Sequence, residues 1–223
     1  MNSKAFYRAL LSFVLLVCLI QKSYSQGLSY QPKGSFSVDV GIPTKEKNLA
    51  FNRVLEGLFN GGVSYQFNVF KGLTIGAGSK YSFFINDRFA LDNSVGKGGL
   101  HIPSMFLKVG YEKFTTDRFS YSFSVRTGYA NLISVNDSSK VALGKAFSES
   151  SFFAEPQLEL LMTTEKNNPN AFSLMLGYAI YFVEYRPEYL SREKFKTLNP
   201  EDSNGVTRFF SFGFGYRYYF GMK

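Results

Sequence analysis

The sequence predicts an all-β protein, an eight-stranded antiparallel up-and-down transmembrane β-barrel. Eight segments between residues 34 and 220 alternate apolar with small or polar residues, which is the period of a β-strand because successive side chains leave opposite faces. The connections alternate in length, long after the odd-numbered segments and short after the even-numbered ones. The apolar faces are rich in Phe and Tyr, whereas the opposite faces are mainly Ser and Gly. Strands with one face toward lipid and one toward a lumen show this pattern.

The N-terminus has the pattern of a signal peptide, predicted at residues 1–25. Lys4 and Arg8 form a basic start, and residues 9–20 (ALLSFVLLVCLI) form an apolar run. Two small residues two positions apart, Ser23 and Ser25, follow it. The run is too short to be a membrane-spanning helix. We therefore expect export and cleavage after Ser25.

Cys18 is the only cysteine of the chain. A lipoprotein signal that uses Cys18 is the alternative to a cleaved signal peptide, but the preceding Val17 is not small and the apolar run continues beyond it. Cleavage leaves a short periplasmic segment at 26–33 and the barrel domain at 34–223. The mature chain then has no cysteine, which excludes disulfides and cysteine metal sites.

Composition and charge exclude several function classes. Mean hydropathy is near neutral at −0.10, which argues against a helical membrane protein but is compatible with alternating strands. The predicted signal peptide carries three of the 25 basic residues and none of the 17 acidic ones, which leaves a net charge of about +5. No dense basic run with interleaved aromatics is present, so we expect no nucleic-acid partner.

The first four predicted strands are 34–42, 58–70, 73–85 and 102–113. In the first, Val38 and Val40 share a face and Asp39 lies on the other. Pro43 is expected to end this strand, because proline cannot donate to a sheet ladder. Residues 71–72 allow only a very tight turn between the second and third strands.

The last four predicted strands are 119–132, 150–162, 172–183 and 206–220. Pro156 is the weak point of the sixth strand, since it removes one ladder donor. The final strand reads VTRFFSFGFGYRYYF and presents aromatic residues at every second position from Phe210 to Phe220. Four strands carry a Gly-Tyr dipeptide in the same phase, with Gly on the polar face: Gly110-Tyr111, Gly128-Tyr129, Gly177-Tyr178 and Gly215-Tyr216. Gly leaves room in a narrow lumen, and Tyr suits a membrane interface.

Two soluble folds are the structural alternatives. A lipocalin-like barrel would turn the apolar faces inward, but eight rows of Phe, Tyr and Leu would overfill so small a barrel. A water-soluble β-sandwich has no reason to keep the alternation of long and short connections. The transmembrane barrel accounts for both observations.

With these strands, the chain from about 34 to 220 resembles the small outer-membrane β-barrel proteins of double-membraned bacteria, the size class of OmpA's barrel and OmpX. Tyr216, Tyr218 and Phe220 are similar to the C-terminal aromatic signal that the barrel-assembly machinery reads in this class, although residues 221–223 follow them here. The resemblance implies outer-membrane localisation, periplasmic termini and contact with outer-membrane lipid and lipopolysaccharide. Barrels of similar length in the PorT group assist protein secretion.

Charged residues on the inward faces are candidates for a network that fills the lumen. Buried charges need partners, and an eight-stranded barrel has an interior just wide enough for side chains. The alternative is a narrow selective path past Arg126 and Glu155. The predicted network consists of Asp39, Lys80, Lys108, Arg126, Glu155, Glu159 and Arg217.

The last long connection is basic and aromatic. It is either an ordinary solvated loop or a contact surface for anionic lipopolysaccharide or an envelope protein partner. The binding candidates in it are Tyr185, Arg186, Tyr189, Arg192, Lys194 and Lys196.

Catalysis and metal binding are not expected. His101 is the only histidine, and its distance of three residues from Ser104 places the two on opposite faces of a strand. One His and no mature Cys make a transition-metal site improbable, and no cofactor motif is present. We expect a non-catalytic integral barrel of the outer membrane that stabilises the envelope or binds through its outer loops. The alternatives are an accessory barrel of a secretion or transport assembly, a lipid-modifying enzyme and a narrow pore.

Overall fold

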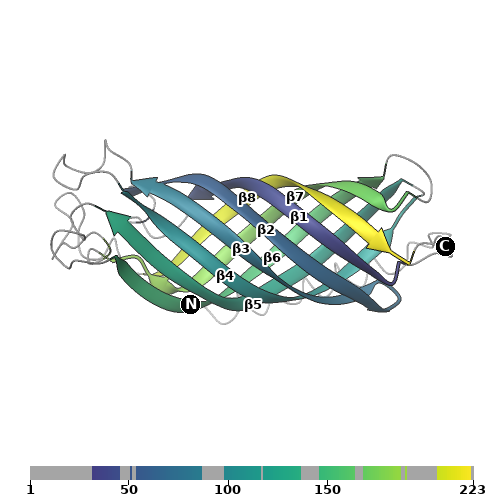
Figure 1. Ribbon diagram of the computed structural model, residues 1–223, viewed down its shortest axis with the longest axis horizontal. Coiled ribbons are helices and arrows are strands. Elements are labelled where there is room, and N and C mark those ends of the chain that lie inside the picture. The colour runs from purple at the N-terminus through teal and green to yellow at the C-terminus, as the bar shows by residue number, and fades with distance from the viewer. Residues whose placement is uncertain are drawn as a thin grey trace, which may run out of the picture.

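A computed structural model describes residues 32–45, 51, 54–86, 98–116, 118–136, 146–163, 168–186, 189 and 205–221. The eight strands within these ranges are β1 (Gly34–Lys45), β2 (Leu55–Phe70), β3 (Leu73–Asn86), β4 (Gly98–Phe114), β5 (Phe119–Asn136), β6 (Phe147–Thr163), β7 (Asn170–Glu184) and β8 (Val206–Phe220). Each strand pairs antiparallel with the next, and β8 pairs with β1, so the sheet is closed (Figure 1). The predicted eight-stranded antiparallel up-and-down barrel is confirmed.

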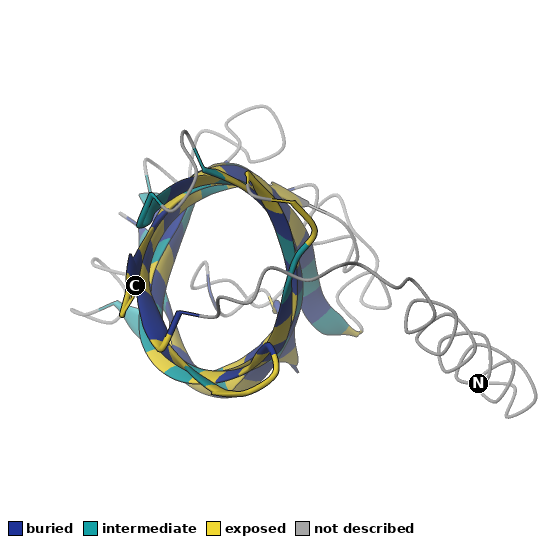
Figure 2. Cartoon of the chain, turned by 90° about the vertical axis from the view of Figure 1, so that its right-hand side faces the viewer, coloured by how far each residue is buried: buried dark blue, intermediate teal, exposed yellow. Residues whose placement is uncertain are grey.

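Side chains alternate between the two surfaces of the barrel wall, apart from register shifts in β2 near Phe59 and Phe70. Figure 2 shows buried and exposed residues alternating around the ring. In β1, Val38 and Val40 are exposed whereas Ser37 and Asp39 are buried. The apolar face therefore points outward and the polar face inward, which is the reverse of the lipocalin-like alternative. An outer surface of this kind is stable only where hydrocarbon surrounds it.

The strands rise well above the height of a bilayer core. β5 has 18 residues, which at about 3.3 Å per residue and a tilt of about 40° gives a height of about 45 Å. The apolar band of outer-membrane barrels is only about 25 Å tall. The turn at Lys71 and Gly72 lies at one end, together with the start of β1 and the end of β8, and the end of β1 and the start of β8 lie at the other (Figure 1). We call these the turn end and the outer end.

Pro43 does not end the first strand, which continues to Lys45. The paired residues of β1 and β2 run only as far as Gly41 and Asn60, whereas pairing of β1 with β8 continues to Lys45 and Phe209. Proline removes a single donor, so it is tolerated where a strand needs only one neighbour. All other strands except β8 also extend beyond the predicted bounds at one or both ends.

The interior has three layers between the turn end and the outer end. A small apolar cluster of Leu161, Ala171 and Tyr219, with Phe114 packed against it, lies at the turn end. Charged side chains fill the middle. A larger cluster, called here the aromatic lid, fills the outer end and consists of Phe51, Val54, Leu55, Phe84, Leu100, Ile102, Phe106, Ala130, Leu132, Phe153, Ala179, Tyr181, Val183, Tyr185, Tyr189 and Phe209.

Candidate functional site: a filled lumen and its mouth

Eight charged side chains meet in the middle of the lumen, and each is at most 5% exposed. They include all seven residues that the sequence analysis proposes for this network. The eighth is Glu112, which brings the set to four acidic and four basic groups. We call the set the charge layer: Asp39, Glu112, Glu155, Glu159, Lys80, Lys108, Arg126 and Arg217.

Glu112 is the centre of the half of the charge layer nearer the turn end. Its carboxylate accepts hydrogen bonds from Arg217 Nη1 at 2.8 Å and Gln66 Nε2 at 3.2 Å, and from the Tyr219 hydroxyl. The other terminal nitrogen of Arg217 donates to Glu159. Every polar atom of this carboxylate is therefore bound, which offsets the cost of its burial.

Sequence reasoning missed Glu112 as a member of the network, although the signal was present. It lies two residues from Gly110 and four from Lys108, so the strand period places all three on the inward face. Lys108 Nζ donates to Glu159 at 2.9 Å. Glu159 thus joins Lys108 of β4 to Arg217 of β8.

The other half of the charge layer connects opposite walls. Arg126 of β5 pairs with Asp39 of β1, with 2.8 Å between Nη2 and Oδ1. Lys80 of β3 pairs with Glu155 of β6. Arg126 and Glu155 are also register partners on neighbouring strands. Because β1 and β5 are four strands apart in an eight-stranded ring, the Asp39–Arg126 pair spans the lumen.

Glycines of the Gly-Tyr dipeptides leave room for inward side chains of neighbouring strands. A Cβ at Gly177 would lie 2.7 Å from Glu155 Oε1, and a Cβ at Gly215 would lie 2.5 Å from Ser173 Oγ. The adjacent Tyr216 points outward and is 38% exposed. The dipeptide therefore combines an open inner position with an interfacial ring on the outer surface.

The aromatic lid lies directly on the charge layer. The Arg126 guanidinium is 4.8 Å from the centroid of Phe106, a cation–π distance. Lys80 Nζ is 5.5 to 5.8 Å from the centroids of three further lid rings, Phe153, Tyr181 and Phe209. A solute entering from the outer end meets packed rings before it reaches the charge layer. The sequence pattern predicts only polar filling, so the lid is an additional closure.

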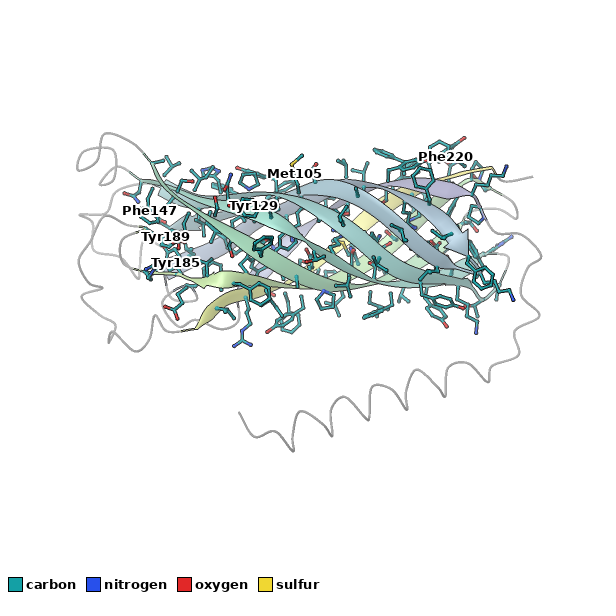
Figure 3. The ribbon with its side chains drawn as sticks, turned by 90° about the horizontal axis from the view of Figure 1, so that it is seen from below. Met105, Tyr129, Phe147, Tyr185, Tyr189 and Phe220 are labelled. Atoms are coloured by element: carbon teal, nitrogen blue, oxygen red, sulfur yellow. The ribbon has the colours of Figure 1, made fainter. Side chains whose placement is uncertain are left out.

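Two of the loop candidates contribute to the lid instead of projecting from it. The side chains of Tyr185 and Tyr189 are buried, and their ring centroids are 4.9 Å apart. Tyr185 also packs edge-on against Phe51 at 5.7 Å, and Tyr189 packs against Phe147 at 4.8 Å. Figure 3 shows Phe147, Tyr185 and Tyr189 together at the outer end. Burial raises the pKa of both phenols well above the ordinary value.

An ion pair fastens the same segment to the barrel mouth. Arg186 Nη2 donates to Glu149 Oε1 at 2.9 Å, and the Tyr189 hydroxyl donates to Glu149 Oε2 at 2.9 Å. The Arg186 side chain remains 47% exposed, so it is accessible from outside. Arg192, Lys194 and Lys196 lie outside the described residues.

The three residues of the predicted assembly signal lie on the outer surface at the turn end. Tyr216, Tyr218 and Phe220 are 38 to 40% exposed, and the rings of Tyr218 and Phe220 meet edge-on at 5.0 Å. Phe220 also approaches Tyr65 of β2 at 5.8 Å across β1. The residues are part of an aromatic belt at this end, and recognition by the assembly machinery stays a prediction.

His101 lies on the outer surface and Ser104 on the inner one, as their spacing predicts. His101 Nδ1 is hydrogen-bonded to the Tyr81 hydroxyl, and its ring stacks on Phe83 with centroids 4.6 Å apart. Within the described ranges, no group of three or more His, Cys, Asp or Glu side chains is placed to hold a metal ion. In the same part of the chain, no helix is long and apolar enough to cross a membrane.

No protein-family model and no curated protein matches the sequence. Solved structures do match. Neisserial surface protein A (NspA) has a TM-score of 0.51 and 12% identity, over 86% of this chain and 100% of that chain. OprG from Pseudomonas aeruginosa has a TM-score of 0.43 and 12% identity, over 85% and 98%. Ail of Yersinia pestis, in complex with the heparin analogue sucrose octasulfate, has a TM-score of 0.42 and 11% identity, over 83% and 99%.

At these identities the likeness concerns the fold. The match to NspA extends over the full length of that protein, and the closed ring of eight antiparallel strands accounts for it. The chain therefore has the fold of the small eight-stranded outer-membrane β-barrel proteins, the class that its sequence resembles.

Proposed function

We propose that this protein is a non-catalytic integral barrel of the outer membrane, closed to solutes, that acts through its outer surface and outer end. The observation that carries the proposal is the double closure of the lumen. The charge layer pairs its four acidic groups with its four basic groups across the barrel. The aromatic lid then covers the charge layer from outside.

The energetics of the charge layer favour a closed state. An ion that passes through the lumen must separate at least one buried pair, and breaking a buried pair costs about 3–5 kcal/mol. The Asp39–Arg126 pair lies across the path. The rings of the lid add a dry layer in which an ion loses its hydration. The interior is therefore unsuited to transport, so we expect binding on the outer wall and at the mouth.

At the mouth, Arg186 is the described basic side chain best placed to meet an anionic partner. It is half-exposed, and Glu149 together with Tyr189 holds it in position. The same connection contains Arg192, Lys194 and Lys196. Lipopolysaccharide phosphates and acidic surfaces of envelope proteins are the partners that such a set favours. The aromatic end of β8 supports delivery by the barrel-assembly machinery after signal-peptide cleavage.

Conductance measurements test the proposal. The purified protein is inserted into planar lipid bilayers in 1 M salt, with an open porin as positive control. We expect no stable conductance steps, because the lumen holds paired charges and packed rings. Reproducible steps from the folded protein would overturn the closed-lumen proposal and favour the narrow path past Arg126 and Glu155.

The accessory-subunit alternative makes a different prediction. A barrel that belongs to a secretion or transport assembly is expected to copurify with larger envelope proteins at a constant ratio. Purification of the tagged protein from native outer membranes in mild detergent measures this ratio. Recovery of the barrel alone is the result that the favoured proposal predicts.

A further inference from the structure

A hollow of about 650 Å³ opens on the outer wall over β1 to β5. Two neighbouring rows of outward residues form it. In one row the register partners from strand to strand are Val38, Val63, Ser79, Met105 and Tyr129. In the next row toward the outer end, Gly61 of β2 is the partner of Tyr81 of β3.

The hollow exists because a small residue interrupts a wall of large ones. Ser79 has a short side chain, whereas Met105 beside it is 74% exposed. The Phe59 ring lies over Gly61 and forms part of the wall of the hollow. Figure 3 shows Met105 projecting from the outer wall near Tyr129. The volume is within the range of about 300–1,000 Å³ that small-molecule sites occupy.

The position of the hollow along the barrel identifies its surroundings. Ser79 is six residues from Leu73, the first residue of β3, so it lies about 15 Å above the turn end at a rise of about 3.3 Å and a tilt of about 40°. The apolar band is about 25 Å tall. The exposed Phe70 and Leu73 mark the start of this band at the turn end. The hollow therefore lies in the outer half of the band, where the outer leaflet supplies the hydrocarbon.

A polar pair borders the hollow on its outer side. The Tyr81 hydroxyl is hydrogen-bonded to His101 Nδ1, and Phe83 holds the His101 ring by stacking. His101 is the register partner of Phe83, one outward row beyond Tyr81. Tyrosine with a polar tip is suited to the boundary between hydrocarbon and head groups.

We propose that this hollow binds one acyl chain of a lipopolysaccharide molecule of the outer leaflet, with the Tyr81–His101 pair at the polar end of the chain. A void beside Met105 would forfeit dispersion contacts on one side. A chain that enters the hollow recovers these contacts, so it stays longer than lipid on the rest of the wall. The inference rests on the proposed location in the outer membrane but not on the closed lumen.

Native mass spectrometry of the detergent-solubilised barrel tests the site. Wild type and variants are incubated with lipopolysaccharide, and in parallel with phosphatidylethanolamine, before the detergent is removed in the gas phase. The test variant is Ser79→Leu, which fills the hollow from its floor. The matched control is Ala154→Leu, which adds the same side chain on the outward face of β6 outside the hollow. Both substitutions add apolar surface on the lipid side, so both barrels are expected to fold.

We expect the wild type and Ala154→Leu to retain one lipopolysaccharide molecule. In Ser79→Leu, retention falls about fivefold, which corresponds to about 1 kcal/mol. Tyr81→Phe, which removes only the hydroxyl, lowers retention by a smaller factor. Equal retention by Ser79→Leu and Ala154→Leu, or equal retention of phosphatidylethanolamine, would overturn the inference. A conducting barrel that still shows the Ser79→Leu effect would overturn the closed lumen and leave the lipid site standing.

Discussion

Replacement of Arg217 by Met is the most demanding test of the charge layer. Arg217 donates to Glu112 at 2.8 Å and also to Glu159. Arg217→Met leaves four buried acidic groups against three basic ones. Glu159 keeps Lys108 at 2.9 Å, so a single carboxylate, Glu112, loses its charged partner. Removal of one partner from a buried pair costs about 3–5 kcal/mol, and we expect a loss of stability in this range.

A second variant separates charge imbalance from lost packing. Glu112→Gln combined with Arg217→Met restores three acidic and three basic groups, and Gln at 112 retains an oxygen that can accept from the Tyr219 hydroxyl. We expect the double variant to recover about 2 kcal/mol relative to Arg217→Met alone, within the range of measured couplings between contacting residues.

Equilibrium urea unfolding of the barrel in lipid vesicles, followed by far-UV circular dichroism and gel mobility, measures these differences. The two readouts must agree for a two-state comparison. A loss below about 1 kcal/mol for Arg217→Met would refute the reasoning. So would a double variant that loses the sum of the two single losses, because additivity means that the two groups do not interact.

Three further predictions use the same assay. Phe209→Ala removes a buried ring of the aromatic lid and should cost about 3–5 kcal/mol; a loss below about 1 kcal/mol would mean that the lid is loosely packed. Arg186→Met should cost less than about 1 kcal/mol, because its pair with Glu149 is half-exposed, and a larger loss would contradict this. Burial raises the pKa of Tyr185 and Tyr189, so the folded state keeps both phenols protonated. The stability that they contribute is complete below the unfolded-state pKa of about 10 and declines as pH rises above it. The Tyr185→Phe/Tyr189→Phe variant should show a flatter decline, and an unchanged slope would contradict this.

The faces of the strands were predictable from the sequence because the backbone alternation fixes them. Val38 and Asp39, or Leu107 and Lys108, are neighbours in the chain and must lie on opposite sides of the wall. Lipid on one side and a narrow lumen on the other then select apolar and polar residues. The sequence pattern therefore predicted the strand number, the inward faces and seven members of the charge layer.

The pairing across the lumen was not predictable in this way. Alternation determines the face of a residue but not its depth or its opposite neighbour, so Asp39 and Arg126 meet across 87 residues without a local signal. The aromatic lid was not predictable for the same reason. Phe84 and Phe209 share the inward phase with polar residues, and no local pattern marks the height at which the lumen changes from polar to apolar. The continuation of β1 past Pro43 was not predictable either. The strand can contain this proline because only β8 still pairs with β1 at that height.

The central claim is that the apolar faces contact lipid and the polar faces fill a closed lumen. Single-cysteine spin labelling along β4 tests it directly, because the only cysteine, Cys18, lies in the predicted signal peptide. Labels are placed at the consecutive positions Ser104, Met105, Phe106 and Leu107 of the reconstituted protein. We predict high accessibility to oxygen at 105 and 107, and low accessibility to both oxygen and a water-soluble nickel complex at 104 and 106. Nickel accessibility at 105 and 107, or oxygen accessibility without a period of two, would contradict the account.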